Sequence, residues 1–174
     1  LTTPSVTYCR DFTGVCEDVY YGRTKYCILP IENTADGTLP GFRRLIAKYE
    51  LKMALTCSVE TSGSGVAKFA LLKKNIGRTE VPAKAVSGAY FDFTVNLRDD
   101  GSASSFGLGD LLTAAGLCGM RLCKIDSLPT EYPDEYSYEL LLSDSGDLEG
   151  FLAVLTLETP GFTPVGIFSH LAPR

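Results

Sequence analysis

A cluster of polar residues follows directly on a short apolar run near the start of the chain. Residues 27–31 are apolar and indicate a buried strand, and Glu32, Asn33 and Thr34 come next, with Gly37 closing the turn. In α/β proteins, a strand that ends in a polar turn before a helix is a common position for ligand sites. The alternative interpretation is an ordinary strand-to-helix connection in which Asn33 or Thr34 caps the helix.

The hydrophobic pattern around this turn predicts the elements that would position it. Apolar residues at near-helical spacing predict a helix over 39–49, with Pro40 in its first turn. Alternating apolar and polar residues predict strands over 51–59 and 66–72, joined by a Ser/Gly turn into a hairpin. The pattern over 11–21 is ambiguous and suits a short helix.

Strand and helix patterns alternate regularly in the second half of the chain. The predicted order is strand, helix, strand, strand, helix, strand, over residues 89–97, 106–117, 120–125, 136–142, 147–157 and 163–169. This βαββαβ order predicts a ferredoxin-like arrangement. Residues 81–88, within a polar stretch, are the expected linker. We therefore expect an α/β (α+β) protein with a first lobe over 1–80 and a second domain over 89–174.

Composition and charge exclude several classes of protein. The chain has 174 residues, of which 45% are hydrophobic, and this suits one soluble domain or two small ones. No apolar run approaches the roughly 20 residues of a membrane span, and no signal peptide is recognisable. The net charge of −5 is scattered along the chain, which argues against a nucleic-acid partner. The chain begins at Leu1 rather than Met, which leaves open a preceding segment.

The cysteines do not form a metal-binding pattern. Six cysteines include no C-x-x-C pair, and His170 is the single histidine, so we expect no structural zinc. Cys27, Cys57 and Cys123 lie in apolar, strand-like contexts and are predicted to be buried. Free thiols of this kind indicate a reducing, cytoplasmic location.

Two motifs resemble those of one enzyme family. Residues 30–34, P-I-E-N-T, with Gly37 three positions on, resemble the P-I-E-N-S/T-x-x-G motif of prephenate dehydratases, and residues 17–26 resemble the lead-in to it. Residues 119–129, G-M-R-L-C-K-I-D-S-L-P, resemble the G-x-N-L-x-x-I-E-S-R-P signature of the ACT regulatory domain, which follows the catalytic part in that family. The resemblance covers residues 17–174.

The resemblance implies a chemistry and a set of catalytic residues. Prephenate dehydratases, which are lyases of phenylalanine biosynthesis, convert prephenate to phenylpyruvate without a cofactor. In the family's T-R-F motif, the Thr hydroxyl is thought to assist the leaving group and the Arg suits a carboxylate. Here Ala67, Lys68 and Phe69 stand at that motif. The implied catalytic set consists of Glu32, Asn33, Thr34, Lys68 and Phe69.

Two departures from the family count against catalysis. Ala67 has no proton to give, and Lys68 lacks the planar fork of Arg; losing one positioned donor typically lowers a rate by about 10² to 10³. In addition, Val59 and Val66 are separated only by a short turn, where the family has a second lobe. Lys68 then has the alternative interpretation of a solvated charge at a strand end.

The ACT resemblance implies an allosteric ligand site and a homodimer. ACT domains of this family bind phenylalanine between two copies, through a G-A-L turn and the E-S-R-P segment. Residues 106–108 (Phe106, Gly107, Leu108) stand at the first, and Asp126 and Ser127 begin the second, in which Leu128 replaces the Arg. The expected ligand-binding residues are therefore Phe106, Gly107, Leu108, Asp126 and Ser127.

Three hypotheses follow from these residues. The first is a regulatory or amino-acid-binding module that has lost dehydratase activity. The second is an active or atypical prephenate dehydratase. The third is a structural partner whose ACT edge pairs with another enzyme of the shikimate branch.

Overall fold

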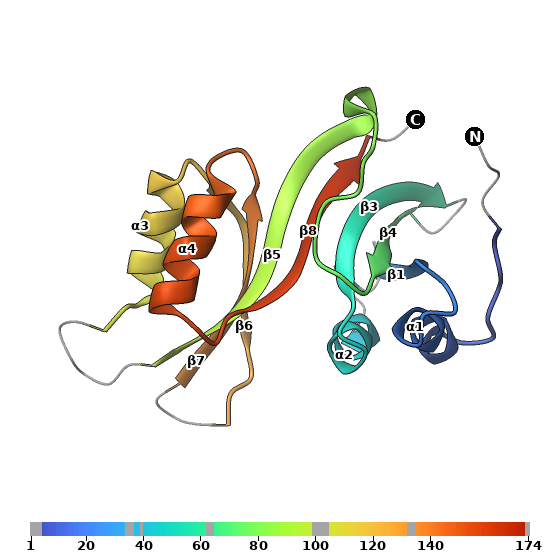
Figure 1. The fold of residues 1–174 in the computed structure, drawn as a ribbon, viewed down its shortest axis with the longest axis horizontal. Helices are drawn as coiled ribbons and strands as arrows, with labels where there is room; N and C mark the ends of the chain where they lie inside the picture. The colour runs from blue at the N-terminus through green and yellow to red at the C-terminus, as the bar shows by residue number, and fades with distance from the viewer. Residues whose placement is uncertain are drawn as a thin grey trace.

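One mixed sheet runs through the whole molecule. The computed structural model describes residues 5–33, 37–38, 40–61, 65–98, 105–131 and 135–172. Within these residues, eight strands form the sheet in the order β2-β1-β4-β3-β8-β5-β7-β6 (Figure 1). The predicted α/β class is confirmed.

The first half of the chain forms the part of the sheet from β2 to β3 and two helices, called here the first unit. Its elements are α1 (Phe12–Tyr20), β1 (Cys27–Asn33), β2 (Gly37–Thr38), α2 (Pro40–Lys48), β3 (Lys52–Thr61) and β4 (Gly65–Lys73). The predicted hairpin is present, since β3 and β4 pair along their whole length from Lys52↔Lys73 to Thr61↔Gly65. The ambiguous segment 11–21 is helical, and the Asp11 side chain accepts a hydrogen bond from the Gly14 backbone N–H at 2.7 Å.

The polar turn after β1 differs from the predicted strand-to-helix connection. β2 pairs back onto β1, with Asn33 opposite Gly37, and α2 begins only at Pro40. Asn33 is therefore a strand residue and not the N-cap of α2. Thr34, the other cap candidate, lies outside the described residues.

The second half has the predicted ferredoxin-like arrangement and is called here the second unit. Its elements are η1 (Ala83–Ala85), β5 (Val86–Arg98), α3 (Leu108–Leu117), β6 (Arg121–Leu128), β7 (Glu135–Ser143), α4 (Leu148–Glu158) and β8 (Thr163–Leu171). The strands lie in the order β8-β5-β7-β6, and each neighbouring pair is antiparallel. The predicted linker residues 81–88 contain η1 and the start of β5; the division into two domains stays a prediction.

The two pairs of helices cover opposite faces of the sheet. Alternate residues of a strand point to opposite faces, and Phe91 and Phe93 of β5 pack with α3 and α4 in one core. Tyr90 of β5 packs instead against the core under α1 and α2. Figure 1 shows α3 and α4 beside the second unit's strands, with α1 and α2 below the first unit's strands. The face of the second unit's sheet that α3 and α4 leave uncovered therefore continues the face on which α2 lies.

The two units are joined at a parallel pair of strands. β3 of the first unit pairs with β8 of the second, with Met53 opposite Gly166 and Thr56 opposite His170. The approach is close, because a Cβ on Gly166 would lie 2.6 Å from the Met53 carbonyl oxygen. Only glycine fits at this point. The pairing of β3 with β8 therefore sets how the sheet of the first unit continues into that of the second.

The cysteines follow the sequence prediction in part. All six are unpaired, Cys27 is buried and Cys57 is half-buried. The prediction is wrong for Cys123, which is exposed, because it lies on β6 at the edge of the sheet. Among the described residues, no helix is long and apolar enough to cross a membrane.

Candidate functional site

A cavity of about 430 Å³ lies between α2 and the open face of the sheet. Its walls come from both units: α2, β1, β3 and β4 on one side, and β5, β6, β7 and β8 on the other. A second cavity of about 490 Å³ adjoins it, and the two share Glu32, Thr56, Lys68, Leu141 and Phe168. We call the two cavities together the groove.

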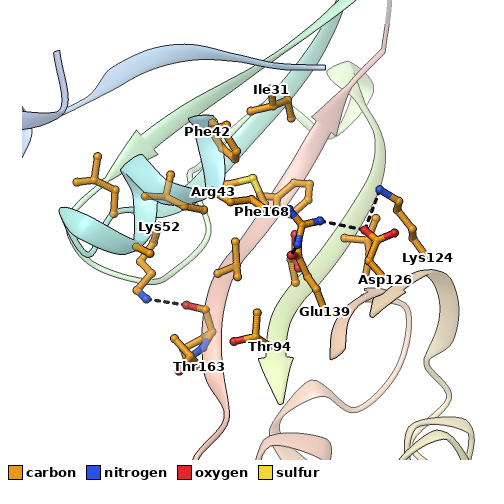
Figure 2. A pocket seen from close by; sticks show the side chains of 18 of the residues that line it. Ile31, Phe42, Arg43, Lys52, Thr94, Lys124, Asp126, Glu139, Thr163 and Phe168 are labelled. Carbon is orange, nitrogen blue, oxygen red and sulfur yellow. Dashed lines mark hydrogen bonds and ion pairs between the residues drawn. The ribbon is translucent and has the colours of Figure 1, made fainter. Parts of the chain in front are cut away.

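Arg43 links the first unit to the second across the groove. Its guanidinium extends from α2 and forms ion pairs with Asp126 on β6, at 2.9 Å, and with Glu139 on β7. Lys124 approaches Asp126 from the other side at 3.0 Å, as Figure 2 shows. The Asp126 side chain is 37% exposed, yet these two cations hold the pKa of its carboxyl below the ordinary value, against the opposing effect of desolvation. Both cations are therefore already engaged by protein carboxylates.

Asp92 is a buried carboxyl group in the wall of the cavity. It lies on β5 and is only 6% exposed, and its Oδ1 has no hydrogen-bond partner. Burial raises its pKa to about 7, although Arg43, Lys124 and Lys68 each favour the charged form. A buried polar atom without a partner is unfavourable. The Asp92 carboxyl is thus a group of this wall whose burial the protein's own hydrogen bonds do not offset.

The rest of the wall is largely apolar. Figure 2 shows Phe42 and Ile31 on one side and Phe168 nearby, and the remaining apolar residues include Ile46, Met53, Leu141 and Val165. Phe42 and Phe168 are both buried, at 7% and 4% exposure. An apolar cavity with a few charged groups is typical of small-molecule sites.

Glu32 and Lys68, two of the residues implied by the resemblance, meet at the groove. They are direct partners in the pairing of β1 with β4, and both line the two cavities. The structure thus brings together two side chains that are 36 positions apart in the sequence.

Phe69, another residue of the catalytic prediction, faces away from this position. Ala67 and Phe69 flank Lys68 on β4, so they point to the opposite face of the sheet. The backbone of Asn33 pairs with that of Ala67 at the end of β1. Thr34 lies outside the described residues.

The two segments of the predicted amino-acid site lie apart within one chain. Phe106 and Leu108 pack against the core under α3 and α4, and the backbone N–H of Gly107 donates to Asp110 at 3.0 Å. Asp126 instead faces the groove, on the opposite side of the sheet. Ser127 alternates with Asp126 on β6 and is exposed.

The second cavity contains a short chain of polar side chains. Thr56 Oγ1 lies 2.9 Å from His170 Nδ1, and Ser58 Oγ lies 3.5 Å from His170 Nε2. Thr56 and Ser58 are alternate residues of β3, so they share a face, and His170 is the direct partner of Thr56 on β8. Desolvation, followed by the charge of Lys68, lowers the pKa of His170 below its ordinary value, so the imidazole is neutral at pH 7.

Sequence reasoning missed three charged residues that complete the groove, Arg43 on α2, Asp92 on β5 and Glu139 on β7. Asp92 had a recognisable signal, a lone carboxylate between Phe91 and Phe93 in an otherwise apolar strand. Arg43 and Glu139 had none, because each is an ordinary charged residue on an amphipathic element. In the described part of the chain, no group of three or more His, Cys, Asp or Glu side chains could hold a metal ion.

Comparisons with known proteins identify relatives by fold. No family model matches the chain, and no curated protein matches it by sequence. Among solved structures it resembles a prephenate dehydratase from Streptococcus mutans, with a TM-score of 0.71, 16% identity, and coverage of 93% of this chain and 84% of that one. It also resembles a prephenate dehydratase from Arthrobacter aurescens in complex with L-Phe, with a TM-score of 0.67, 15% identity, and coverage of 92% of this chain and 80% of that one. A third similar structure is GqqA, described as a novel type of quorum quenching acylase, with a TM-score of 0.66, 15% identity, and coverage of 92% of this chain and 80% of that one. The chain therefore has the fold of prephenate dehydratases.

Proposed function

We propose that this protein is a prephenate dehydratase-like binding module, without dehydratase activity, whose groove binds an amino acid with an apolar side chain. The observation that carries the proposal is the buried Asp92 carboxyl, whose Oδ1 has no partner and which lines a cavity of about 430 Å³. The structural neighbours support a place in aromatic amino-acid metabolism, and one of them was solved with L-Phe.

The charges of the groove suit a zwitterion. The ligand's ammonium group would donate to Asp92 and so relieve the unfavourable burial of a lone carboxylate. Lys68 lies close enough to Asp92 to influence its pKa and has no ion-pair partner among the described residues, so it is the cation available for the ligand's carboxylate. Arg43 and Lys124 are less available, because they already pair with Asp126 and Glu139.

The apolar wall suits an aromatic or large aliphatic side chain. Phe42, Met53 and Phe168 line the cavity, and aromatic rings contribute strongly when they bury a ligand. L-phenylalanine is therefore the first probe, followed by L-tyrosine, L-tryptophan and L-leucine.

The hairpin of β3 and β4 is the feature that counts against dehydratase activity. These strands are joined through residues 62–64, where the family resemblance implies a second lobe, so the groove lacks the wall that would exclude water. Ala67 also faces away from Lys68, and no hydroxyl can be offered from that position.

An active dehydratase remains the alternative, and one observation favours it. Glu32 and Lys68 lie opposite each other at the groove, and Thr56 and Ser58 supply hydroxyls nearby. Phenylpyruvate formation from prephenate by the purified chain decides between the two. We expect no phenylpyruvate formation by the folded protein. Turnover by wild type that is lost in both Glu32→Ala and Lys68→Ala would show that the protein is an active dehydratase.

The binding proposal is tested by a thermal-shift titration with the four amino acids. A saturable rise in Tm is expected for wild type and is expected to be lost in Asp92→Asn. Asp144→Asn is the matched control, because Asp144 pairs with Arg78 and does not line the groove. Absence of a shift with all four amino acids would overturn the proposal.

A further inference from the structure

We propose that Ser58, His170 and Thr56 form a serine esterase site in the second cavity of the groove. The three side chains form one hydrogen-bonded chain, with Ser58 Oγ at 3.5 Å from His170 Nε2 and Thr56 Oγ1 at 2.9 Å from His170 Nδ1. This is the order of a nucleophile, a base and a group that orients the base. The site goes beyond amino-acid binding and does not depend on it.

The base is held in one orientation by the sheet. Thr56 is 1% exposed and lies directly opposite His170 in the pairing of β3 with β8. When His170 Nδ1–H donates to Thr56 Oγ1, Nε2 carries the lone pair and faces Ser58. Thr56 is thus a positioning residue, whereas Ser58 and His170 would touch the substrate.

The surroundings keep His170 in the form that a base requires. The charged and titratable groups lining this cavity come from four strands: Glu32 on β1, Lys68 on β4, Tyr90 on β5 and Cys123 on β6. Desolvation and the Lys68 charge lower the pKa of His170, so the ring is unprotonated at neutral pH.

The cavity also indicates the class of substrate. Lys68 is the direct partner of Ser58 across β3 and β4, both line this cavity, and the Lys68 charge acts on His170. A cation in this position stabilises the oxyanion of an acyl transfer. Val66, Leu141 and Phe168 supply an apolar wall for the acyl group. The expected substrates are small carboxylic esters with an apolar acyl chain.

The reaction balances with water as the second reactant. Ser58 Oγ bonds to the ester carbonyl carbon while its proton passes to His170 Nε2. The ester C–O bond then breaks, and the alcohol leaves with that proton. Water next attacks the acyl-serine, giving its proton to His170, and the carboxylic acid is released as Ser58 regains its hydrogen.

The test uses two probes, because six free thiols also react with activated esters. A fluorophosphonate, which labels activated serines, is expected to modify Ser58 in the full chain, as mapped by mass spectrometry. Hydrolysis of p-nitrophenyl butyrate is expected to fall by about 10² or more in Ser58→Ala and His170→Gln. Ser87→Ala is the control, because the Ser87 hydroxyl bonds the backbone oxygen of His170 and not its ring.

A pH profile keeps the proposal testable if His170→Gln does not fold. The wild-type rate should rise through a pKa below the ordinary histidine value of 6.5 and level off near neutrality. Lys68→Met should lower the rate and move this rise to higher pH, because the Lys68 charge is one cause of the lowered pKa. Unlabelled Ser58 in the folded chain, or hydrolysis unchanged in Ser58→Ala, would overturn the proposal.

Discussion

At the scale of single residues, Asp92 is a charged residue type in an environment that disfavours charge. A carboxylate in the middle of β5 is only 6% exposed and has one oxygen without a partner, and the cations around it do not offset the desolvation. Selection for stability alone would favour a neutral side chain at this position. The carboxyl group is therefore best explained by a ligand, as local conflicts of this kind concentrate at functional sites.

Asp92→Asn is expected to stabilise the protein at high pH. The folded pKa of about 7 lies above the ordinary 3.8, so the folded state binds the proton more tightly. Wild-type stability therefore falls as the pH rises from about 4 to 7, and the penalty persists above pH 7. Urea unfolding at pH 8 should show the variant more stable by up to about 4 kcal/mol, with nearly equal stabilities at pH 4. A variant that is less stable at pH 8 would contradict the buried, unpaired carboxylate.

Arg43→Ala is expected to destabilise the protein. The guanidinium pairs with Asp126 and Glu139, and it also favours the charged form of Asp92. Its side chain is 30% exposed, which moderates the loss to about 2 kcal/mol in urea unfolding. Arg44→Ala on the same helix is the control and should change the stability by less than about 0.5 kcal/mol. Equal losses in both variants would show that Arg43 acts only through helix propensity.

Residue roles were the least accessible part of the structure from sequence. Glu32 and Lys68 were identified because motifs and strand patterns marked them. His170 was noticed only as the single histidine, and nothing linked it to Thr56 and Ser58, which are more than 110 positions away. Such sites depend on long-range strand pairing, which local periodicity does not contain.

At the scale of elements, the hydrophobic pattern predicted α2, α3, α4 and every described strand except β2, whereas the pattern over 11–21 was ambiguous. Alternation located β3 to β8, and the helical spacing of apolar residues located α2, α3 and α4. The two-residue strand β2 is too short to show a pattern. The parallel pairing of β3 with β8 was also not predicted, because its two strands belong to separate halves of the sequence.

Gly166→Ala is expected to disrupt the junction between the units. A Cβ there would lie 2.6 Å from the Met53 carbonyl oxygen and 2.9 Å from the Met53 backbone nitrogen, and backbone atoms cannot move aside cheaply. A loss of more than about 2 kcal/mol in unfolding free energy is expected. Gly161→Ala, which has open space around it, is the control. Equal stability of the two variants would contradict the tight approach of β3 and β8.

At the scale of the whole molecule, the groove exists because two units share one sheet. α3 and α4 cover only one face of the second unit, and α2 extends Arg43 over the other. The groove thus combines Glu32 and Lys68 from the first unit with Asp92 from the second. Neither unit alone contains the complete set of groups.

A homodimer is expected from the ACT resemblance, and β6 is the strand to test. Among the described strands β6 forms one edge of the sheet, and its Leu122 and Ile125 are 42% and 37% exposed. Light scattering after size-exclusion chromatography should give twice the mass of the 18.8 kDa chain, and Ile125→Lys should give the monomer. A wild-type protein that is monomeric at all concentrations would contradict the expected homodimer.

Calorimetric titration of L-phenylalanine into wild type and Asp92→Asn, at pH 6 and pH 8, tests the central claim most directly. If the ammonium of the ligand binds ionised Asp92, whose pKa in the free protein is about 7, wild type should bind about tenfold more tightly at pH 8 than at pH 6. Asp92→Asn should bind at least about 30-fold more weakly at pH 8, with little dependence on pH. Equal binding by the two proteins, or no saturable binding by wild type at either pH, would contradict an amino-acid site built on Asp92.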